Sequence, residues 1–105
     1  MSAEQSDNYI LAQNVRPRLA AKARMQIDQL TGEPVVLYPE GVLLLNATGA
    51  EILRLCDGQH TFLAIVRELA HRYNVSPEVL QREVNTYLVR LHKRSLVEFS
   101  SEEKT

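Results

Sequence analysis

The chain has 105 residues, of which 45% are hydrophobic and 24% charged, and its formal net charge is −1 at neutral pH. These values describe one globular domain and argue against the strongly basic character of most nucleic-acid-binding domains. No apolar run approaches a membrane span of ~20 residues, the N-terminus lacks the blocks of a signal peptide, and one cysteine cannot form an internal disulfide. We therefore expect a cytoplasmic protein.

The ends of the chain are polar and its centre is apolar. Residues 1–15 have few apolar side chains, and we expect a flexible N-terminal arm with room for one short ordered patch. Pro17 favours an extended conformation in the residue before it and marks the entry to the folded domain. We place this domain at residues 16–99 and expect residues 100–105 to form a frayed tail.

Three apolar stretches in the first half predict an antiparallel meander. Residues Ala21–Asp28 alternate between apolar and polar, as in a strand with one wet face. Val35–Tyr38 and Val42–Asn46 are short apolar strands, and the Pro39-Glu40-Gly41 sequence between them is typical of a tight turn.

A first helix is predicted directly after this meander. Thr48 and Glu51 have the spacing of a capping box, in which each side chain accepts a hydrogen bond from a free backbone N–H. Asp57-Gly58 is then expected to end the helix, because glycine readily adopts a left-handed conformation.

Two further helices follow. Thr61 is expected to cap the second helix and Asn74 to close it, whereas Ser76-Pro77 has the capping residue and first-turn proline of a third. Their predicted apolar faces are Phe62, Ile65, Val66, Leu69 and Tyr73, and then Val79 or Leu80 with Val84, Leu88 and Leu91. Leu96–Phe99 fits either a short strand or an extended tail. The predicted fold is α+β and winged-helix-like, with a three-stranded antiparallel meander followed by three helices.

No pattern in the sequence points to catalysis. His60, His71 and His92 are too widely spaced for a common metal motif, and Cys56 with a nearby histidine is more typical of a buried, inert thiol. The nucleotide-binding and nucleophile motifs are absent from the sequence. We expect no enzyme activity, no cofactor and no metal.

A winged-helix DNA-binding protein is an alternative to be weighed. The third helix and its end have more basic than acidic residues, namely Arg82, Arg90, Lys93 and Arg94 against Glu78 and Glu83. The basic side chains lie at the C-terminal end, whereas base readout normally uses the N-terminal part of a recognition helix. A solvated face that complements the helix dipole is the better interpretation, and we expect no nucleic-acid partner.

The third strand is the other candidate surface. Val42, Leu43, Leu44, Leu45 and Asn46 contain no charge, so one face of this strand is expected in the core and the other needs a cover. Either the third helix supplies it, or an extended peptide adds as a further strand beside that helix.

The same segment resembles the coenzyme PQQ synthesis protein D (PqqD) family. The matching text is Val36-Leu37-Tyr38-Pro39-Glu40-Gly41, Leu45-Asn46, Ile52-Leu53 and Leu55-Cys56-Asp57-Gly58, and the resemblance extends over about residues 16–99.

This resemblance implies a non-catalytic peptide chaperone in pyrroloquinoline quinone biosynthesis. It would bind the precursor peptide PqqA and present it to the radical SAM enzyme PqqE, through a groove between the third strand and the third helix. Val42–Asn46 would supply the strand side of that groove, and Glu83, Tyr87 and Arg90 the helix side. The text also fits a recognition element for another ribosomally made modified peptide. We expect a monomer or a strand-exchanged homodimer.

Overall fold

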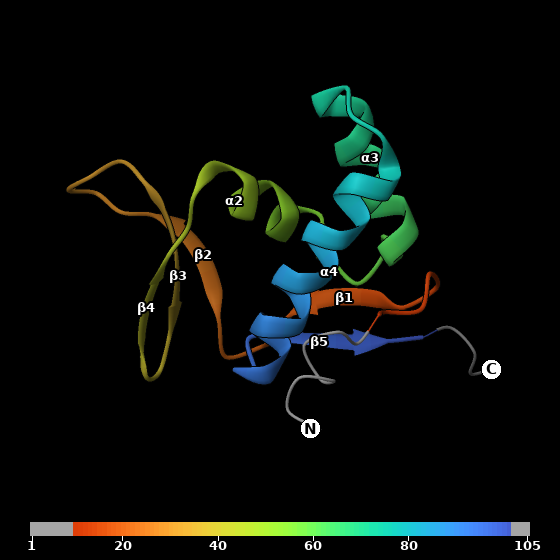
Figure 1. Ribbon diagram of the computed structural model, residues 1–105. Coiled ribbons are helices and arrows are strands. Elements are labelled where there is room, and N and C mark those ends of the chain that lie inside the picture. The colour runs from red at the N-terminus through yellow and green to blue at the C-terminus, as the bar shows by residue number, and fades with distance from the viewer. Residues whose placement is uncertain (1–9, 102–105) are drawn as a thin grey trace, which may run out of the picture.

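The computed structural model describes residues 10–101, whose elements run in the order β1-β2-β3-β4-α2-α3-α4-β5 (Figure 1). The strands are β1 (Arg16–Leu19), β2 (Arg24–Ile27), β3 (Pro34–Tyr38), β4 (Gly41–Leu44) and β5 (Val97–Ser100). The helices are α2 (Ala47–Arg54), α3 (Phe62–Tyr73) and α4 (Pro77–Lys93). The predicted α+β class, with an antiparallel meander followed by three helices, is confirmed.

The strands form two antiparallel sheets, which Figure 1 shows on different sides of the helices. The sheet β2-β3-β4 is the predicted meander, although its first strand begins at Arg24 rather than Ala21. The second sheet joins the two ends of the domain, with Arg16 opposite Ser100 and Leu19 opposite Val97. The stretch after α4 is therefore a strand, whereas β1 had no counterpart among the predicted strands.

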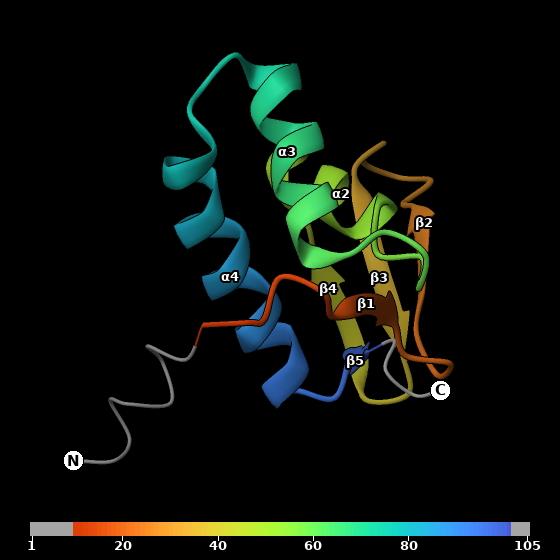
Figure 2. The same cartoon turned by 90° about the vertical axis from the view of Figure 1, so that its right-hand side faces the viewer.

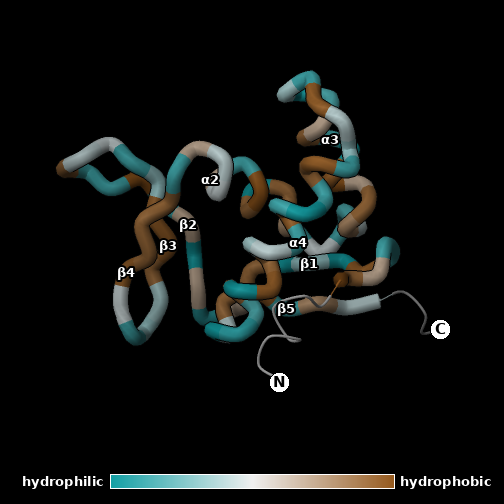
Figure 3. Tube along the Cα trace, viewed as in Figure 1, coloured by the Kyte–Doolittle hydropathy of each residue, from teal (hydrophilic) through white to brown (hydrophobic). Residues whose placement is uncertain are grey.

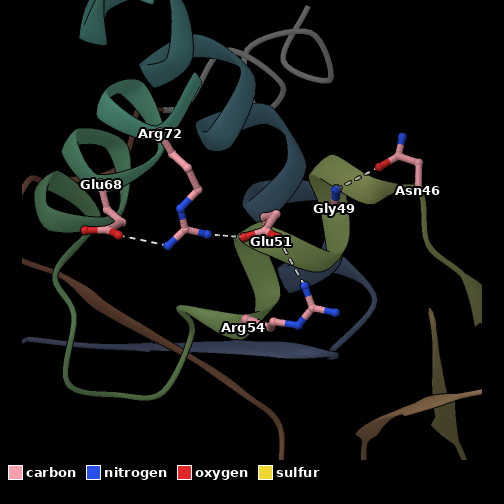
Figure 4. Close-up of polar contacts among 6 residues, drawn as sticks. All are labelled: Asn46, Gly49, Glu51, Arg54, Glu68 and Arg72. Carbon is pink, nitrogen blue, oxygen red and sulfur yellow. Dashed lines mark hydrogen bonds and ion pairs between the residues drawn. The ribbon is translucent and has the colours of Figure 1, made fainter. Parts of the chain in front are cut away.

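The start of α2 differs from the prediction. Its N-cap is Asn46, whose Oδ1 accepts a hydrogen bond of 2.7 Å from the Gly49 N–H. Thr48 lies within the first turn, so the predicted capping box of Thr48 and Glu51 is wrong. The Glu51 carboxylate instead contacts arginines of two helices (Figure 4).

The end of α2 also comes earlier than predicted. The helix stops at Arg54, with Leu55 as its C-cap. Gly58 does have a left-handed φ of 78°, but it belongs to the loop that follows. There the Asp57 carboxylate accepts from the N–H groups of Gln59 and His60, so local side-chain hydrogen bonds shape this loop.

The caps predicted for the other helices are confirmed. Thr61 Oγ1 accepts from the Ala64 N–H at 3.1 Å, and Asn74 closes α3 in a left-handed conformation with φ 57°. Ser76 is the N-cap of α4, without a side-chain hydrogen bond, and Pro77 occupies the first turn.

The core lies between the helices and the inner faces of the sheets. The members with no measurable exposure are Ile65, Leu69, Val84 and Leu88. Figure 3 shows the same hydrophobic stretches on α3, on α4 and along β3 and β4. Leu80 rather than Val79 joins the core, and Tyr73, predicted for the apolar face of α3, is 40% exposed.

The segment before β1 is packed onto the helices. Leu11 is 3% exposed, and its N–H donates to Oδ1 of the buried Asn85 on α4 at 2.7 Å. The carbonyls of Gln13 and Val15 accept from the first N–H groups of α3. Residues 10–15 are thus ordered, while the rest of the predicted arm (1–9) and the end of the predicted tail (102–105) lie outside the described residues.

Candidate functional site

The open edge of β4 presents unpaired backbone groups. The sheet order β2-β3-β4 leaves one side of β4 without a partner among the described strands. The Leu45 N–H donates to the Pro34 carbonyl, so Leu45, and Leu43 two residues earlier, direct their backbone groups toward β3. Val42 and Leu44 therefore direct their N–H and C=O groups toward the open edge, where an added strand would bond to them.

The side chains of β4 divide between two faces. Leu43 packs against the core and Leu45 is buried, as the sequence predicted for one face. Val42 and Leu44 point the other way and are 55% and 74% exposed. Within residues 10–101, no segment covers these two side chains, so α4 is not their cover.

In the view of Figure 2 helix α4 is on the side of the meander where β4 lies, whereas in the view of Figure 1 β2 is the meander strand nearest to it, so the relation of α4 to the meander is defined by its side-chain contacts. Two close contacts fix one stripe of this helix against the meander and the start of α2. The Tyr87 hydroxyl lies so close to Gly49 that a Cβ built there would be 2.4 Å from it. About two helical turns further on, at the C-cap of α4, Arg94 Nη2 donates to the Tyr38 hydroxyl at 2.9 Å.

The residues predicted for the helix side of the site lie on this stripe. Tyr87 is half-buried, and burial together with the nearby Cys56 raises the pKa of its hydroxyl. Glu83 and Arg90 are exposed on either side of it, and neither has a hydrogen-bond or ion-pair partner within the described chain. We call the combined surface of Val42, Leu44, Glu83, Tyr87 and Arg90 the β4–α4 face.

Asn46, predicted as the last residue of the strand side, is already committed to another contact. Its side-chain oxygen caps α2 through the Gly49 N–H, as Figure 4 shows. Asn46 therefore holds the start of α2 next to Tyr87, and its side-chain oxygen is not free for a ligand.

Titratable groups elsewhere have structural contacts. Cys56 is buried, its thiol donates to the Ile52 carbonyl, and burial with the adjacent Asp57 raises its pKa to about 12. His92 stacks on Phe99 with ring centroids 4.4 Å apart. In the described part of the chain, no group of three or more histidine, cysteine or acidic side chains could hold a metal ion.

Three contributors to the β4–α4 face were missing from the sequence prediction. Gly49 admits the Tyr87 ring, and Tyr38 and Arg94 join the far end of α4 to the meander. Arg94 follows Arg90 by four residues, so the helical repeat could have identified it. The closeness of Gly49 to Tyr87 depends on packing and has no local signal in the sequence.

Comparison with known proteins places the chain in a defined family. The family model for coenzyme PQQ synthesis protein D (PqqD) matches residues 33–97, which include the meander strands β3 and β4 and all three helices. The chain belongs to the PqqD family. None of the helices in residues 10–101 combines the length and apolar character needed to cross a membrane.

Several PqqD relatives are similar over much of their length. The chain is 47% identical over 58 residues to a PqqA binding protein of Methylococcus capsulatus, which covers 55% of this chain and 62% of that one. It is 36% identical over 84 residues to a PqqA binding protein of Pseudomonas paraeruginosa, covering 78% and 88% of the two chains.

A solved PqqD structure has the same fold. The solution structure of the PqqD part of Methylobacterium extorquens PqqCD matches with a TM-score of 0.73 and 25% identity, over 89% of this chain and 98% of that one. That protein is described as a stand-alone recognition element for a ribosomally synthesized and post-translationally modified peptide. A peptide-binding role in PQQ biosynthesis is therefore the function that the relatives support.

Proposed function

We propose that this chain binds a PqqA-type precursor peptide as an additional strand on β4, beside α4, and presents it to a radical SAM enzyme without catalysing a reaction itself. The observation that carries the proposal is the open edge at Val42 and Leu44, where free backbone groups and exposed apolar side chains coincide. Strand addition to a sheet edge draws affinity from main-chain bonds and sequence preference from neighbouring side chains.

The surroundings of the edge suit such a ligand. Tyr87 offers a half-buried aromatic side chain, and its contact with Gly49 holds the ring in place. The exposed Glu83 and Arg90 add one charge of each sign to the same helix stripe. A peptide on this edge would thus meet main-chain, aromatic and charged groups together.

The direct test is isothermal titration of the protein with a synthetic PqqA peptide at moderate salt, combined with amide chemical-shift mapping. Saturable one-to-one binding with the largest shifts along β4 and the Tyr87 side of α4 is expected. Shifts confined to other elements would refute the site. No binding by a folded sample would refute PqqA as the ligand and favour a different modified peptide.

Substitutions on the β4–α4 face sharpen this test. Leu44→Glu places a charge on the outer side of the edge strand, and Tyr87→Ala removes the ring, so each is expected to weaken peptide binding about tenfold or more. Leu30→Glu is the matched control for Leu44→Glu, because Leu30 is an apolar side chain 94% exposed in the β2–β3 turn. Circular dichroism checks folding; unchanged affinity in both folded variants would show that the peptide binds elsewhere.

Presentation to an enzyme requires a separate experiment. A ternary complex of this chain, the peptide and the radical SAM enzyme should be detectable by size-exclusion chromatography and should increase the rate of peptide modification.

A modest loss of peptide affinity between low and moderate salt is expected, because main-chain bonds dominate. A steep, DNA-like salt dependence of binding to a duplex would instead favour the winged-helix alternative.

A further inference from the structure

Two contacts show which part of α4 corresponds to each end of β4. Tyr38 is the pairing partner of Gly41, so the contact of Arg94 with Tyr38 marks the Gly41 end of β4. Gly49 follows the other end of the strand, so the contact of Tyr87 with Gly49 marks that end. Arg90 lies between Tyr87 and Arg94 in sequence and on the same helical stripe.

A strand added at this edge would show its side chains alternately to two different surfaces. Neighbouring strands share one pleat, so peptide residues level with Val42 and Leu44 place their side chains on the outer face. There they would meet exposed valine and leucine side chains, for which apolar partners are favourable. The intervening peptide residues would point to the inner side, toward α4.

The inner side is cationic toward the Gly41 end of β4. Three other arginines of the described chain have acidic partners: Arg18 pairs with Glu98, and Figure 4 shows Arg54 with Glu51 and Arg72 with Glu51 and Glu68. Arg94 donates to a neutral phenol instead, and Arg90 lacks a partner in the described chain. Their position complements the dipole at the end of α4, but it leaves both guanidinium groups able to bind a carboxylate.

We propose that the peptide segment bound on β4 is a strand with apolar side chains where it faces Val42 and Leu44 and a carboxylate where it faces Arg90 and Arg94. This inference rests on the proposed function and specifies the class of sequence that the site selects. It predicts an apolar-acidic alternation in the bound segment.

The test uses a fluorescein-labelled synthetic PqqA peptide and a series in which each carboxylate in turn is converted to its amide. One amide variant of the peptide is expected to bind wild-type protein about fivefold more weakly than the parent peptide does. This is the effect of losing one exposed ion pair of about 1 kcal/mol. The Arg90→Gln protein should bind the parent peptide equally weakly and should no longer distinguish that member. Arg82→Gln, on an exposed face of the same helix away from Tyr87, is the matched control and should leave the discrimination intact.

The predicted apolar positions of the peptide have their own control variant. Wild-type protein should prefer the parent peptide to a peptide variant with serine at the position that faces Leu44. The Leu44→Ser protein should bind the parent peptide more weakly and should lose this preference. The Leu30→Ser protein should behave like wild type in both respects. If chemical shifts place the peptide on β4 but every amide variant binds equally, the carboxylate inference is refuted and strand addition stands. If no peptide perturbs β4, strand addition itself is refuted.

Discussion

At the scale of single residues, Gly49 on α2 leaves no room for a side chain beside Tyr87 of the β4–α4 face. A Cβ at this position would lie 2.4 Å from the Tyr87 hydroxyl oxygen and 2.8 Å from its Cζ. Gly49→Ala must therefore displace the ring, and we expect a loss of unfolding free energy of about 1–2 kcal/mol together with weaker peptide binding. Urea denaturation and titration of the same sample measure the two effects.

The double variant Gly49→Ala with Tyr87→Phe identifies the cause. Loss of the hydroxyl removes the shorter of the two contacts, so the second substitution should restore part of the stability lost in the first. Additive losses in the double variant would show that the contact is not the source of the destabilisation.

Asp57 predicts a dependence of stability on acid pH. Partial desolvation raises the pKa of its carboxyl, but hydrogen bonds from the N–H groups of His60 and Gln59 and from the His60 ring outweigh this and lower the pKa from 3.8 to about 2. A carboxyl with a lowered folded-state pKa stabilises the fold above pH 3.8 and loses this contribution as pH falls toward 2. Asp57 is exposed, so solvent screening keeps the effect below about 1 kcal/mol.

The matching measurement is urea denaturation of wild-type and Asp57→Asn protein across the same acid range. The difference in unfolding free energy between the two should shrink as pH falls from about 4 to about 2. A difference that stays constant over this range would show that the Asp57 charge does not contribute.

At the scale of elements, the segment 10–15 packs against both α3 and α4 through hydrogen bonds. The Leu11 N–H has a buried acceptor in Asn85, and a buried donor without an acceptor costs about 1–3 kcal/mol. Asn85→Ala should therefore destabilise the whole domain by at least about that amount. Amide hydrogen exchange should show the strongest local loss of protection at Leu11, and exchange spread evenly over the domain would contradict a local role for this contact.

Helices α2 and α3 are joined by ion pairs between their side chains. Glu51 on α2 contacts Arg72 on α3 as well as Arg54 on its own helix, and Arg72 also contacts Glu68 (Figure 4). Asn46 is the N-cap of α2, so Thr48 and Glu51 do not form the capping box that their spacing suggested, and Glu51 makes these ion pairs instead. A contact between residues 21 positions apart replaced a local one.

At the scale of the whole molecule, the parts that the sequence could predict are those that local chemistry determines. The caps at Thr61 and Ser76, the closing residue Asn74 and the meander all have short-range signals, and each is present. Pairing of β1 with β5 joins residues as far apart in sequence as Arg16 and Ser100 in strands of only four residues, and no local pattern encodes that partnership. The placement of Tyr87 against Gly49 likewise required the packed fold.

The turn that joins β2 to β3 is the position where we expect a substitution to change assembly. The Gly32 N–H donates to the Asp28 carbonyl, and Gly32 itself has a left-handed φ of 75° with nothing within 4 Å of an added Cβ. A β-branched residue here would strain the closed turn by about 1–2 kcal/mol through the backbone alone. An open turn would relieve that strain and let β2 pair with β3 of a second chain.

We therefore expect Gly32→Val to shift the protein toward a strand-exchanged dimer, in which every β2–β3 bond is kept but made between chains. Light scattering over a concentration series should give a mass that rises from one chain to two at lower concentration than for wild type. Gly32→Asn is the control, because asparagine tolerates the left-handed conformation and should behave like wild type. A single-chain mass for Gly32→Val at all concentrations would show that this turn does not act as a hinge, since its strain would then be absorbed within the monomer.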